Sequence, residues 1–362
     1  MAVTSSSSAV TSVFVVGKYP TQLLTVEPDK AASNAPPKPL LIATPTETGD
    51  FPVLMLLHGY MFLNSFYSQL IQHIASHGFI VVAPQLYLLV GCHATEEIKC
   101  SAEVTDWLSE GLSSFLPSQV HPDLEKLGLA GHSRGGKVAF ALALGKTATT
   151  NLKFSAIIGV DPVGGTSPNI LDTTPDHFDL NMPAMVIGSG LGEVKRNFLS
   201  CPCAPKGLNH AAFYNKCNAP ACYLVAKDFG HTDMLDDDTR GSLRGKLSYC
   251  MCKNGAARAP MREFVGGAVV AFLRGFLESD MKPLMGIIDQ TETAPVELQA
   301  VDSKDLSSVN SISLLFLRAS CFCTALDLIF VTSAAKSKAS SESLILFSLV
   351  HEILRRLGAL LR

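Results

Sequence analysis

The segment from Lys126 to Leu144 constrains the fold more than any other part of this 362-residue chain. Lys126–Ala130 has the composition of a short strand, and Lys137–Leu144 has the apolar periodicity of a helix. Between them stands the string Gly131-His132-Ser133-Arg134-Gly135-Gly136. A strand can turn this sharply into a helix only where glycines replace side chains that would collide with neighbouring backbone. The pattern therefore predicts a strand–turn–helix element of an α/β sheet.

Further apolar runs, each bounded by turn residues, predict the rest of the sheet. The expected strands are Thr11–Val16, Pro39–Thr44, Pro52–Leu57, Phe79–Ala83, Lys126–Ala130, Phe154–Val160, Ala184–Gly188 and Cys222–Lys227. Helical patterns lie between several of them, for example at about Ala102–Phe115, and Met261–Leu277 is the expected closing helix. This alternation is typical of the α/β class, so we expect a mostly parallel sheet with helices on both faces.

Ser133 is the candidate nucleophile of this sheet. The turn places its hydroxyl at the carboxyl edge, where open α/β folds bind their ligands. The following helix directs the positive end of its dipole at the negative charge that forms during acyl transfer. A G-x-S-x-G string in an ordinary loop would carry little information, but the strand–turn–helix context is specific. We therefore predict that Ser133 attacks an ester carbonyl.

A serine nucleophile needs a general base, and two histidines downstream of Ser133 are candidates. His231 lies just past the last predicted strand, in a loop that can reach back over the serine. His210 lies in a loop rich in Cys, Asn and Pro, which makes it the weaker candidate. We favour His231 as general base in acylation and as general acid toward the leaving alcohol.

The acid that orients the histidine has two candidates, each at the end of a predicted strand. Asp161 directly follows Phe154–Val160, which places its carboxylate at the sheet edge. Glu193 follows the next strand after several flexible residues, at a more usual acid position for this type of sheet. We favour Asp161 without excluding Glu193. Asp233 and the run Asp236–Asp238 are expected to form a solvated loop.

The oxyanion hole is expected to combine two backbone N–H groups. One is that of Arg134, and the other comes from the loop after Pro52–Leu57, with Tyr60 as the natural donor and Met61 as the alternative. Two such donors stabilise the negative oxygen that forms when a nucleophile adds to a carbonyl.

Two apolar loops leave the carboxyl ends of strands beside the nucleophile. The predicted substrate-binding residues are Met61, Phe62, Leu63, Leu86, Tyr87 and Leu88. Isolated apolar residues would be ordinary core, but two such loops at one edge favour a long apolar substrate.

The composition agrees with an apolar ligand or a membrane surface. Hydrophobic residues make up 47% of the chain and charged residues 17%, with a mean hydropathy of +0.26. The net charge is -3, and no segment combines basic with aromatic residues. We therefore expect no nucleic-acid partner.

The ten cysteines leave three interpretations open. The doublets Cys201/Cys203 and Cys250/Cys252 indicate a zinc site, disulfides near the rim of the active site, or small core residues. Structural zinc sites usually contain C-x-x-C pairs, whereas both doublets are C-x-C, so zinc is disfavoured. We expect no metal ion and no cofactor.

Several longer strings together resemble those of plant chlorophyllases, a family within the α/β-hydrolase superfamily. The strings are Met55-Leu56-Leu57-His58-Gly59-Tyr60, Ala75-Ser76-His77-Gly78-Phe79-Ile80, Gly131–Gly136, Asp161-Pro162-Val163, Val186-Ile187-Gly188, Gly190–Glu193 and His231-Thr232-Asp233-Met234-Leu235-Asp236-Asp237-Asp238. The resemblance runs from about Thr11 to about Asp302. It implies hydrolysis of chlorophyll to chlorophyllide and phytol, with no metal cofactor. It also implies a triad of Ser133, Asp161 and His231, and thus supports Asp161 over Glu193.

Two other functions compete with this one. The chain could be a broader carboxylesterase or lipase acting on apolar esters, or a pigment- or lipid-binding protein without turnover. The complete set of Ser133, Asp161 and His231 argues against a binding protein, which has no need of all three. We expect chlorophyll as the small-molecule partner, contact with pigment-bearing membranes, and a chloroplast location, with the cytosol or an endomembrane surface as alternatives.

The chain is expected to divide into three regions. Residues 1–10 form a disordered N-terminus without a secretory signal, 11–302 the α/β-hydrolase domain, and 303–362 a divergent C-terminal tail, partly helical or disordered. Within the tail, the apolar run Leu314–Val331 is interrupted by Arg318 and Asp327, which argues against a transmembrane helix. The tail does not resemble the chlorophyllases.

Overall fold

The computed structural model describes residues 12–29, 31, 33–88, 93–165, 167–173 and 176–306. Our expectations of a disordered segment at residues 1–10 and of a partly helical tail beyond Leu306 concern positions outside these residues. Within the described part of the chain, no helix combines the length and the hydropathy that a bilayer-spanning segment requires.

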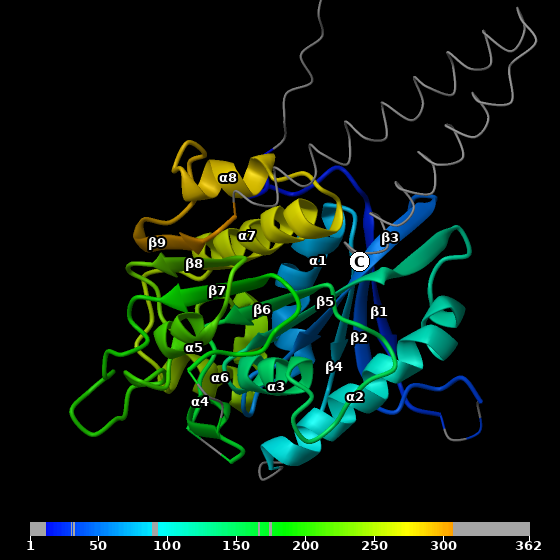
Figure 1. The fold of residues 1–362 in the computed structure, drawn as a ribbon. Coiled ribbons are helices and arrows are strands. Elements are labelled where there is room, and N and C mark those ends of the chain that lie inside the picture. The colour runs from blue at the N-terminus through cyan, green and yellow to red at the C-terminus, as the bar shows by residue number, and fades with distance from the viewer. Residues whose placement is uncertain are drawn as a thin grey trace, which may run out of the picture. The chain divides into compact units, whose positions relative to one another are not determined.

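The described residues form one nine-stranded sheet in the order β1-β2-β4-β3-β5-β6-β7-β8-β9 (Figure 1). The strands are β1 (Thr21–Val26), β2 (Leu40–Pro45), β3 (Gly49–Leu57), β4 (Ile80–Pro84), β5 (Val120–His132), β6 (Ala156–Val160), β7 (Ala184–Ser189), β8 (Ala221–Ala226) and β9 (Leu298–Lys304). From β4 to β8 all neighbours pair in parallel, whereas β1, β2 and β9 add antiparallel pairs at the two edges. The mostly parallel sheet confirms the predicted fold class.

Helices cover both faces of this sheet. They are α1 (Ser68–Ser76), α2 (Ala94–Gly111), α3 (Arg134–Ala143), α4 (Ile170–Thr173), α5 (His210–Lys216), α6 (Leu243–Cys250), α7 (Ala259–Leu277) and α8 (Lys282–Ile288). Val53, Met55 and Leu57 of β3 belong to the core that contains the apolar residues of α2 and α3. The alternate residues Leu54 and Leu56 point to the opposite face and are equally buried. Burial on both faces explains why the central strands read as continuous apolar runs.

The predicted strand Thr11–Val16 is wrong. Of its residues, 12–16 lie in a turn, and Phe14 packs its ring on Phe264 of α7 with the centroids 6.2 Å apart. Backbone carbonyls of this turn contact two histidines instead of a neighbouring strand. His73 of α1 and His77, the residue after α1, each contact one of these carbonyls at 2.9 Å. The apolar pattern here reflects burial against α7 and not strand pairing.

The two strands that the sequence did not indicate lie at the edges of the sheet. In β1 only Val26 is buried, and β9 has no buried residue. An edge strand with mixed polar and apolar residues lacks both the continuous apolar run of a central strand and a clear alternation. β9 also extends to Lys304, two residues beyond the expected end of the domain.

Candidate active site

Ser133 sits on the tight turn between β5 and α3, where the glycine pattern predicts it. Its backbone angles, φ 56° and ψ -124°, lie in a region that residues with side chains rarely adopt. A Cβ on Gly131 would lie 2.2 Å from the carbonyl oxygen of Gly135. A Cβ on Gly135 would lie 2.4 Å from the carbonyl oxygen of Leu57. Both positions therefore require glycine, and the turn presents the Ser133 hydroxyl at the carboxyl edge of the sheet.

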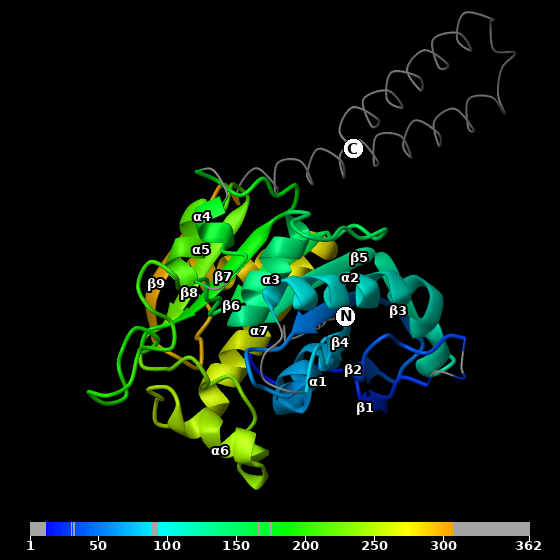
Figure 2. The same cartoon turned by 90° about the horizontal axis from the view of Figure 1, so that it is seen from below.

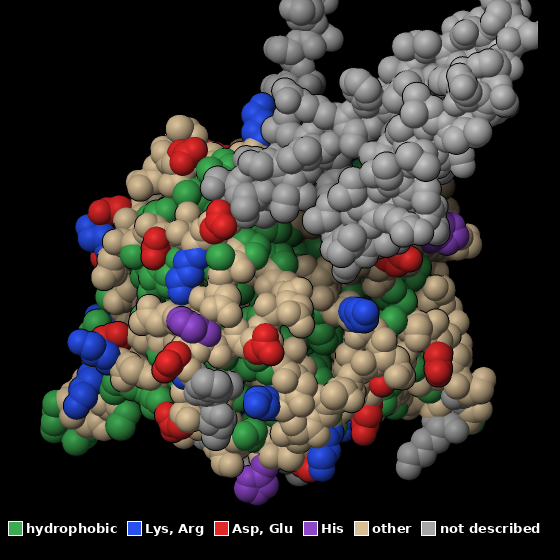
Figure 3. Space-filling model, viewed as in Figure 1, with side chains coloured by type: hydrophobic (Ala, Val, Ile, Leu, Met, Phe, Trp, Pro, Cys, Tyr) green, Lys and Arg blue, Asp and Glu red, His purple; other side chains and the backbone are tan. Residues whose placement is uncertain are grey.

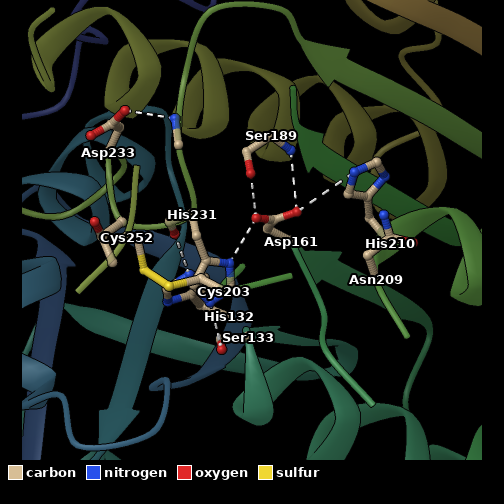
Figure 4. A network of polar contacts seen from close by, with 12 residues as sticks. His132, Ser133, Asp161, Ser189, Cys203, Asn209, His210, His231, Asp233 and Cys252 are labelled. Atoms are coloured by element: carbon tan, nitrogen blue, oxygen red, sulfur yellow. Dashed lines mark hydrogen bonds and ion pairs between the residues drawn. A yellow bond between two sulfur atoms is a disulfide. The ribbon is translucent and has the colours of Figure 1, made fainter. Parts of the chain in front are cut away.

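The structure brings Ser133, His231 and Asp161 together from the loops after β5, β8 and β6 (Figure 4). His231 Nε2 lies 2.7 Å from Ser133 Oγ, and His231 Nδ1 lies 2.7 Å from Asp161 Oδ2. A carboxylate can only accept a hydrogen bond, so Nδ1 carries the hydrogen and donates a hydrogen bond to Asp161. This leaves Nε2 free to accept the hydroxyl proton, which is the geometry that a general base needs.

Asp161 is fully buried, and its carboxylate accepts three hydrogen bonds, one from His231 and two from Ser189. Ser189 donates its hydroxyl to Asp161 Oδ2 at 2.5 Å and its backbone N–H to Oδ1 at 3.2 Å. Burial alone would raise the pKa of Asp161, but the hydrogen bonds from His231 and Ser189 and the charges of two neighbouring histidines lower it to about 2. The carboxyl group is therefore ionised at neutral pH. Ser189 ends β7 at the same sheet edge, and its position at a strand end is the one sequence signal for this contact.

The two alternatives that the sequence left open have other partners. Glu193 accepts a hydrogen bond from the Asn209 side chain at 2.6 Å. His210 lies on the side of Asp161 opposite to His231, with its Nε2 3.9 Å from Asp161 Oδ1 (Figure 4). Its other ring nitrogen contacts the Tyr223 hydroxyl at 2.7 Å. His210 thus approaches the carboxylate and not the serine.

A buried hydrogen-bond chain that the sequence did not indicate links three loops of the site. The Gly59 N–H donates to the Tyr67 hydroxyl at 2.9 Å, and that hydroxyl donates to His132 Nδ1 at 2.7 Å. His132 Nε2 then donates to the carbonyl oxygen of His231 at 2.8 Å. Burial lowers the pKa of His132 to about 3, so the ring is neutral and can accept at one nitrogen and donate at the other.

The expected oxyanion donors lie on two sides of the serine. Arg134 begins α3, so its N–H is in the first turn of that helix. Within the described residues the Tyr60 N–H has no hydrogen-bond acceptor, whereas the Met61 N–H donates to the Tyr87 hydroxyl at 3.2 Å. This difference favours Tyr60 over Met61 as the second donor. The Arg134 guanidinium also lies 5.0 Å from the Tyr60 ring centroid and pairs with the buried Glu97 at 2.5 Å.

A cleft of about 590 Å³ opens at the Ser133 hydroxyl. Its lining residues are Tyr60, Phe62, Ser133, Arg134, Val163, Gly164, Ser200, Cys201, Pro202, Cys203, His231, Met251 and Cys252. The far wall thus comes from the loop between β7 and α5 and from the end of α6. Neither segment was among the substrate-binding residues expected from the sequence.

Of those six expected residues, only Phe62 lines this cleft. Leu63 and Leu88 line a separate hollow of about 270 Å³. Leu86 and Tyr87 are buried in the hydrophobic core, where the Tyr87 ring packs on the His58 ring. The Tyr87 hydroxyl accepts the backbone N–H of Met61, which is half-buried. Of the second apolar loop, the described residues Leu86, Tyr87 and Leu88 therefore do not line the cleft at Ser133.

A disulfide between Cys203 and Cys252 closes the far wall of the cleft, with their Cα atoms 5.7 Å apart. It joins the loop between β7 and α5 to the chain just after α6. Cys217 and Cys222 are buried without a disulfide, so the chain uses cysteines both as a link at the rim and as core residues. Across the described ranges, no group of three or more His, Cys, Asp and Glu side chains could hold a metal ion.

The interpretation of Asp233 and Asp236 as part of a solvated loop is wrong, since both are buried. Asp233 Oδ2 accepts the backbone N–H groups of Gly230 and Gly255, each at 2.6 Å. Asp236 accepts the hydroxyl of Ser68 at 2.5 Å, at the start of α1. Asp233 thus supplies an acceptor for a buried N–H of the loop that carries His231, and Asp236 joins that loop to the first turn of α1.

A serine on a strand–helix turn, with a histidine at its hydroxyl and a buried carboxylate behind, defines a serine hydrolase of the α/β-hydrolase class. A family model described as Chlorophyllase matches residues 9–305. The chain belongs to the chlorophyllase family, as its motifs predict.

The chain is also similar to individual chlorophyllases. It is 55% identical to Chlorophyllase-2 of Arabidopsis thaliana, over 81% of this chain and 98% of that protein. It is 44% identical to Chlorophyllase-1 of Arabidopsis thaliana, over 82% of this chain and 93% of that protein. It is also 44% identical to the protein named Chlorophyllase-1, chloroplastic, of Citrus unshiu, over 84% and 92%.

Proposed function

We propose that this chain is a serine carboxylic-ester hydrolase that cleaves the phytyl ester of chlorophyll and releases chlorophyllide and phytol. The names of its relatives support chlorophyll as the substrate. The observation that carries the chemistry is the pair of 2.7 Å contacts linking Ser133 Oγ through His231 to Asp161.

In the proposed mechanism the Ser133 oxygen attacks the ester carbonyl while its proton moves to His231 Nε2. The ionised Asp161 stabilises the resulting imidazolium. The backbone N–H groups of Arg134 and Tyr60 bind the oxyanion, and losing one such donor costs roughly 3–4 kcal/mol of barrier. His231 then returns its proton to the phytol oxygen, which leaves an acyl-enzyme.

Water completes the cycle, with His231 as the base that activates it and Ser133 as the leaving group. The lining of the cleft supports an apolar substrate, since Phe62, Val163 and Met251 face it together with the Tyr60 ring. Every step uses a side chain or backbone group of this chain, so the proposal includes no metal ion and no cofactor.

The proposal extends to a chloroplast location and to contact with pigment-bearing membranes. Two relatives from Citrus are named chloroplastic, which supports the location. A fluorescent fusion of the full chain should overlap the chlorophyll emission of the cell; a signal spread through the cytosol would contradict this part of the proposal.

The test of the chemistry compares wild type with Ser133→Ala. We expect wild type to be labelled by a fluorophosphonate and to release phytol from chlorophyll, and the variant to do neither while keeping its circular dichroism spectrum. Incubation with a short-chain aryl ester in parallel measures substrate breadth. Faster turnover of the aryl ester than of chlorophyll would favour a broader carboxylesterase. An unlabelled wild type with an intact fold would favour a binding protein.

A further inference from the structure

Large apolar side chains are exposed on two segments beside the cleft. Phe198 and Leu199 are 88% and 82% exposed, and Leu243 is 76% exposed. A phenylalanine left almost wholly in water forgoes most of the free energy that burial of its ring would provide. Clusters of such residues on a folded surface are typical of contact sites.

These residues lie next to the entrance of the cleft. The chain from Leu199 runs directly into Ser200–Cys203, and the helix that Leu243 begins runs into Met251 and Cys252, all of which line the cleft. The disulfide Cys203–Cys252 joins the two segments. The Arg196 side chain adds a hydrogen bond to the Cys250 carbonyl. Figure 2 shows the loop between β7 and α5 and the α6 segment projecting on the same side of the molecule.

Residues 194–203 and 240–253 of these segments carry basic residues and no acidic ones, although Glu193 and Asp236–Asp238 lie just before them and the chain as a whole has a net charge of -3. We call residues 194–203 together with 240–253 the rim. The basic residues of the rim are Lys195, Arg196, Arg240, Arg244, Lys246 and Lys253. Figure 3 shows hydrophobic and basic side chains gathered on the projecting loop at the lower left. The rim therefore combines exposed apolar side chains with a local positive charge.

We propose that the rim docks on the surface of a lipid bilayer that contains anionic head groups. Aromatic and aliphatic side chains at a membrane surface enter the boundary between head groups and acyl chains. Lysine and arginine beside them are attracted to the negative charge of anionic lipids. Exposed apolar side chains on projecting loops, with basic side chains between them, suit a bilayer better than a protein partner. A fluid lipid surface requires no fixed complementary shape.

This proposal rests on the proposed function, because an ester with a phytyl tail partitions into lipid. Docking by the rim turns the entrance of the cleft toward the bilayer. The ester then reaches Ser133 from the membrane without passing its phytyl tail through water, which avoids the free-energy cost of exposing that chain. The rim is a binding surface and takes no part in the chemical steps.

The experiment measures co-sedimentation of the full-length protein with phosphatidylcholine vesicles, with and without phosphatidylglycerol. We expect wild type to bind the anionic vesicles more strongly, and added salt to weaken this binding. The double substitution Phe198→Ser and Leu199→Ser should weaken it by about tenfold or more. Lys195→Gln with Lys246→Gln should weaken binding to anionic vesicles only. Val16→Ser is the matched control, since Val16 is 73% exposed but lies beside the end of α1, away from the cleft.

Hydrolysis of a soluble aryl ester should be the same in wild type, the Phe198 and Leu199 variant and the control. Equal vesicle binding by wild type and that variant, or no binding by wild type, would overturn the proposal. If the variant hydrolyses chlorophyll in vesicles as fast as wild type does, the rim proposal fails and the proposed function stands. If wild type binds vesicles but hydrolyses chlorophyll neither there nor in detergent, the proposed function fails and the rim proposal stands.

Discussion

Asp161 lies between two histidines, with His231 at 2.7 Å and His210 at 3.9 Å from its two oxygens. The pKa of about 2 follows from these two neighbours and from the hydrogen bond of the Ser189 hydroxyl. Because this pKa is far below neutral, the carboxylate stays ionised wherever the enzyme is expected to work. The residue that we propose stabilises the imidazolium is thus already ionised before the substrate binds.

Asp161→Asn should lower kcat for chlorophyll hydrolysis by about 10⁴-fold, because the amide cannot stabilise the imidazolium and disturbs the histidine tautomer. In wild type the carboxyl of Asp161, with a pKa of about 2, stays ionised between about pH 5 and pH 8 and adds no pH dependence of its own there. Glu193→Gln is the matched control, and its kcat should stay within about threefold of wild type, because Glu193 contacts Asn209. A larger loss in Glu193→Gln than in Asp161→Asn would move the acid to Glu193.

Tyr67 uses one hydroxyl to hold two parts of the site, the Gly59 N–H and the His132 ring. Tyr67→Phe leaves both buried groups without that partner, and we expect kcat to fall about tenfold. KM should change by less than about twofold, because the hydroxyl does not line the cleft. Tyr249→Phe removes a hydroxyl that bonds the Asp237 carbonyl at the surface and serves as control. A KM increase with unchanged kcat would contradict a positioning role for Tyr67.

At the scale of elements, the turn between β5 and α3 depends on close backbone approach and not on side-chain contacts. A Cβ at Gly131 would lie 2.2 Å from the carbonyl oxygen of Gly135, well inside the normal contact distance of about 3.5 Å. The nearest atoms to this Cβ all belong to the backbone of Gly135 and Gly136, so the backbone itself would have to move. The element that presents the nucleophile therefore cannot accept even the smallest side chain at this position.

Gly131→Ala should destabilise the protein by about 3 kcal/mol or more and lower the yield of folded chain. Gly241→Ala is the matched control, because a Cβ there meets nothing within 4 Å. Its free energy of unfolding should stay within about 0.5 kcal/mol of wild type. Urea unfolding of both variants measures the difference, and equal stability would show that the turn relaxes at little cost.

At the scale of the whole molecule, β9 is the last strand of the sheet and follows β8 in the sheet, although α6, α7 and α8 lie between them in the sequence. It pairs antiparallel with β8, and Lys304 donates from its Nζ to the carbonyls of Tyr214 and Cys217 at 2.9 and 2.8 Å. These carbonyls lie at the end of α5, where helix carbonyls lack partners. The folded unit thus includes Leu306, which is buried, although we expected the domain to end at 302.

A chain ending at Leu306 should therefore keep the melting temperature and the chlorophyll hydrolysis of the full chain within error. A chain ending at Pro295 lacks β9 and exposes the edge of β8, so its melting temperature should fall by about 5 °C or more. Differential scanning fluorimetry and a hydrolysis assay measure both. Loss of activity in the chain ending at Leu306 would show that residues 307–362 contribute to function.

The sequence predicted the central strands because these are buried on both faces and must be apolar throughout. The edge strands β1 and β9 were not predicted, because strands with both exposed and buried residues lack that continuous apolar run. Phe14 shows the opposite error, since it is apolar and buried but lies outside the sheet. The second apolar loop shows the same limit, since hydrophobicity does not tell whether Tyr87 faces the cleft or the core.

The sequence by itself determined the nucleophile turn, since the steric requirement for glycines around Ser133 is local to a few residues. It also determined the class of sheet and, through its motifs, the family. Only the tertiary structure decided which carboxylate meets His231, which cysteines join at the rim, and that Tyr67 links the loops. The physical reason is that these contacts join residues tens of positions apart, and their partners depend on how strands from distant parts of the chain align at one edge.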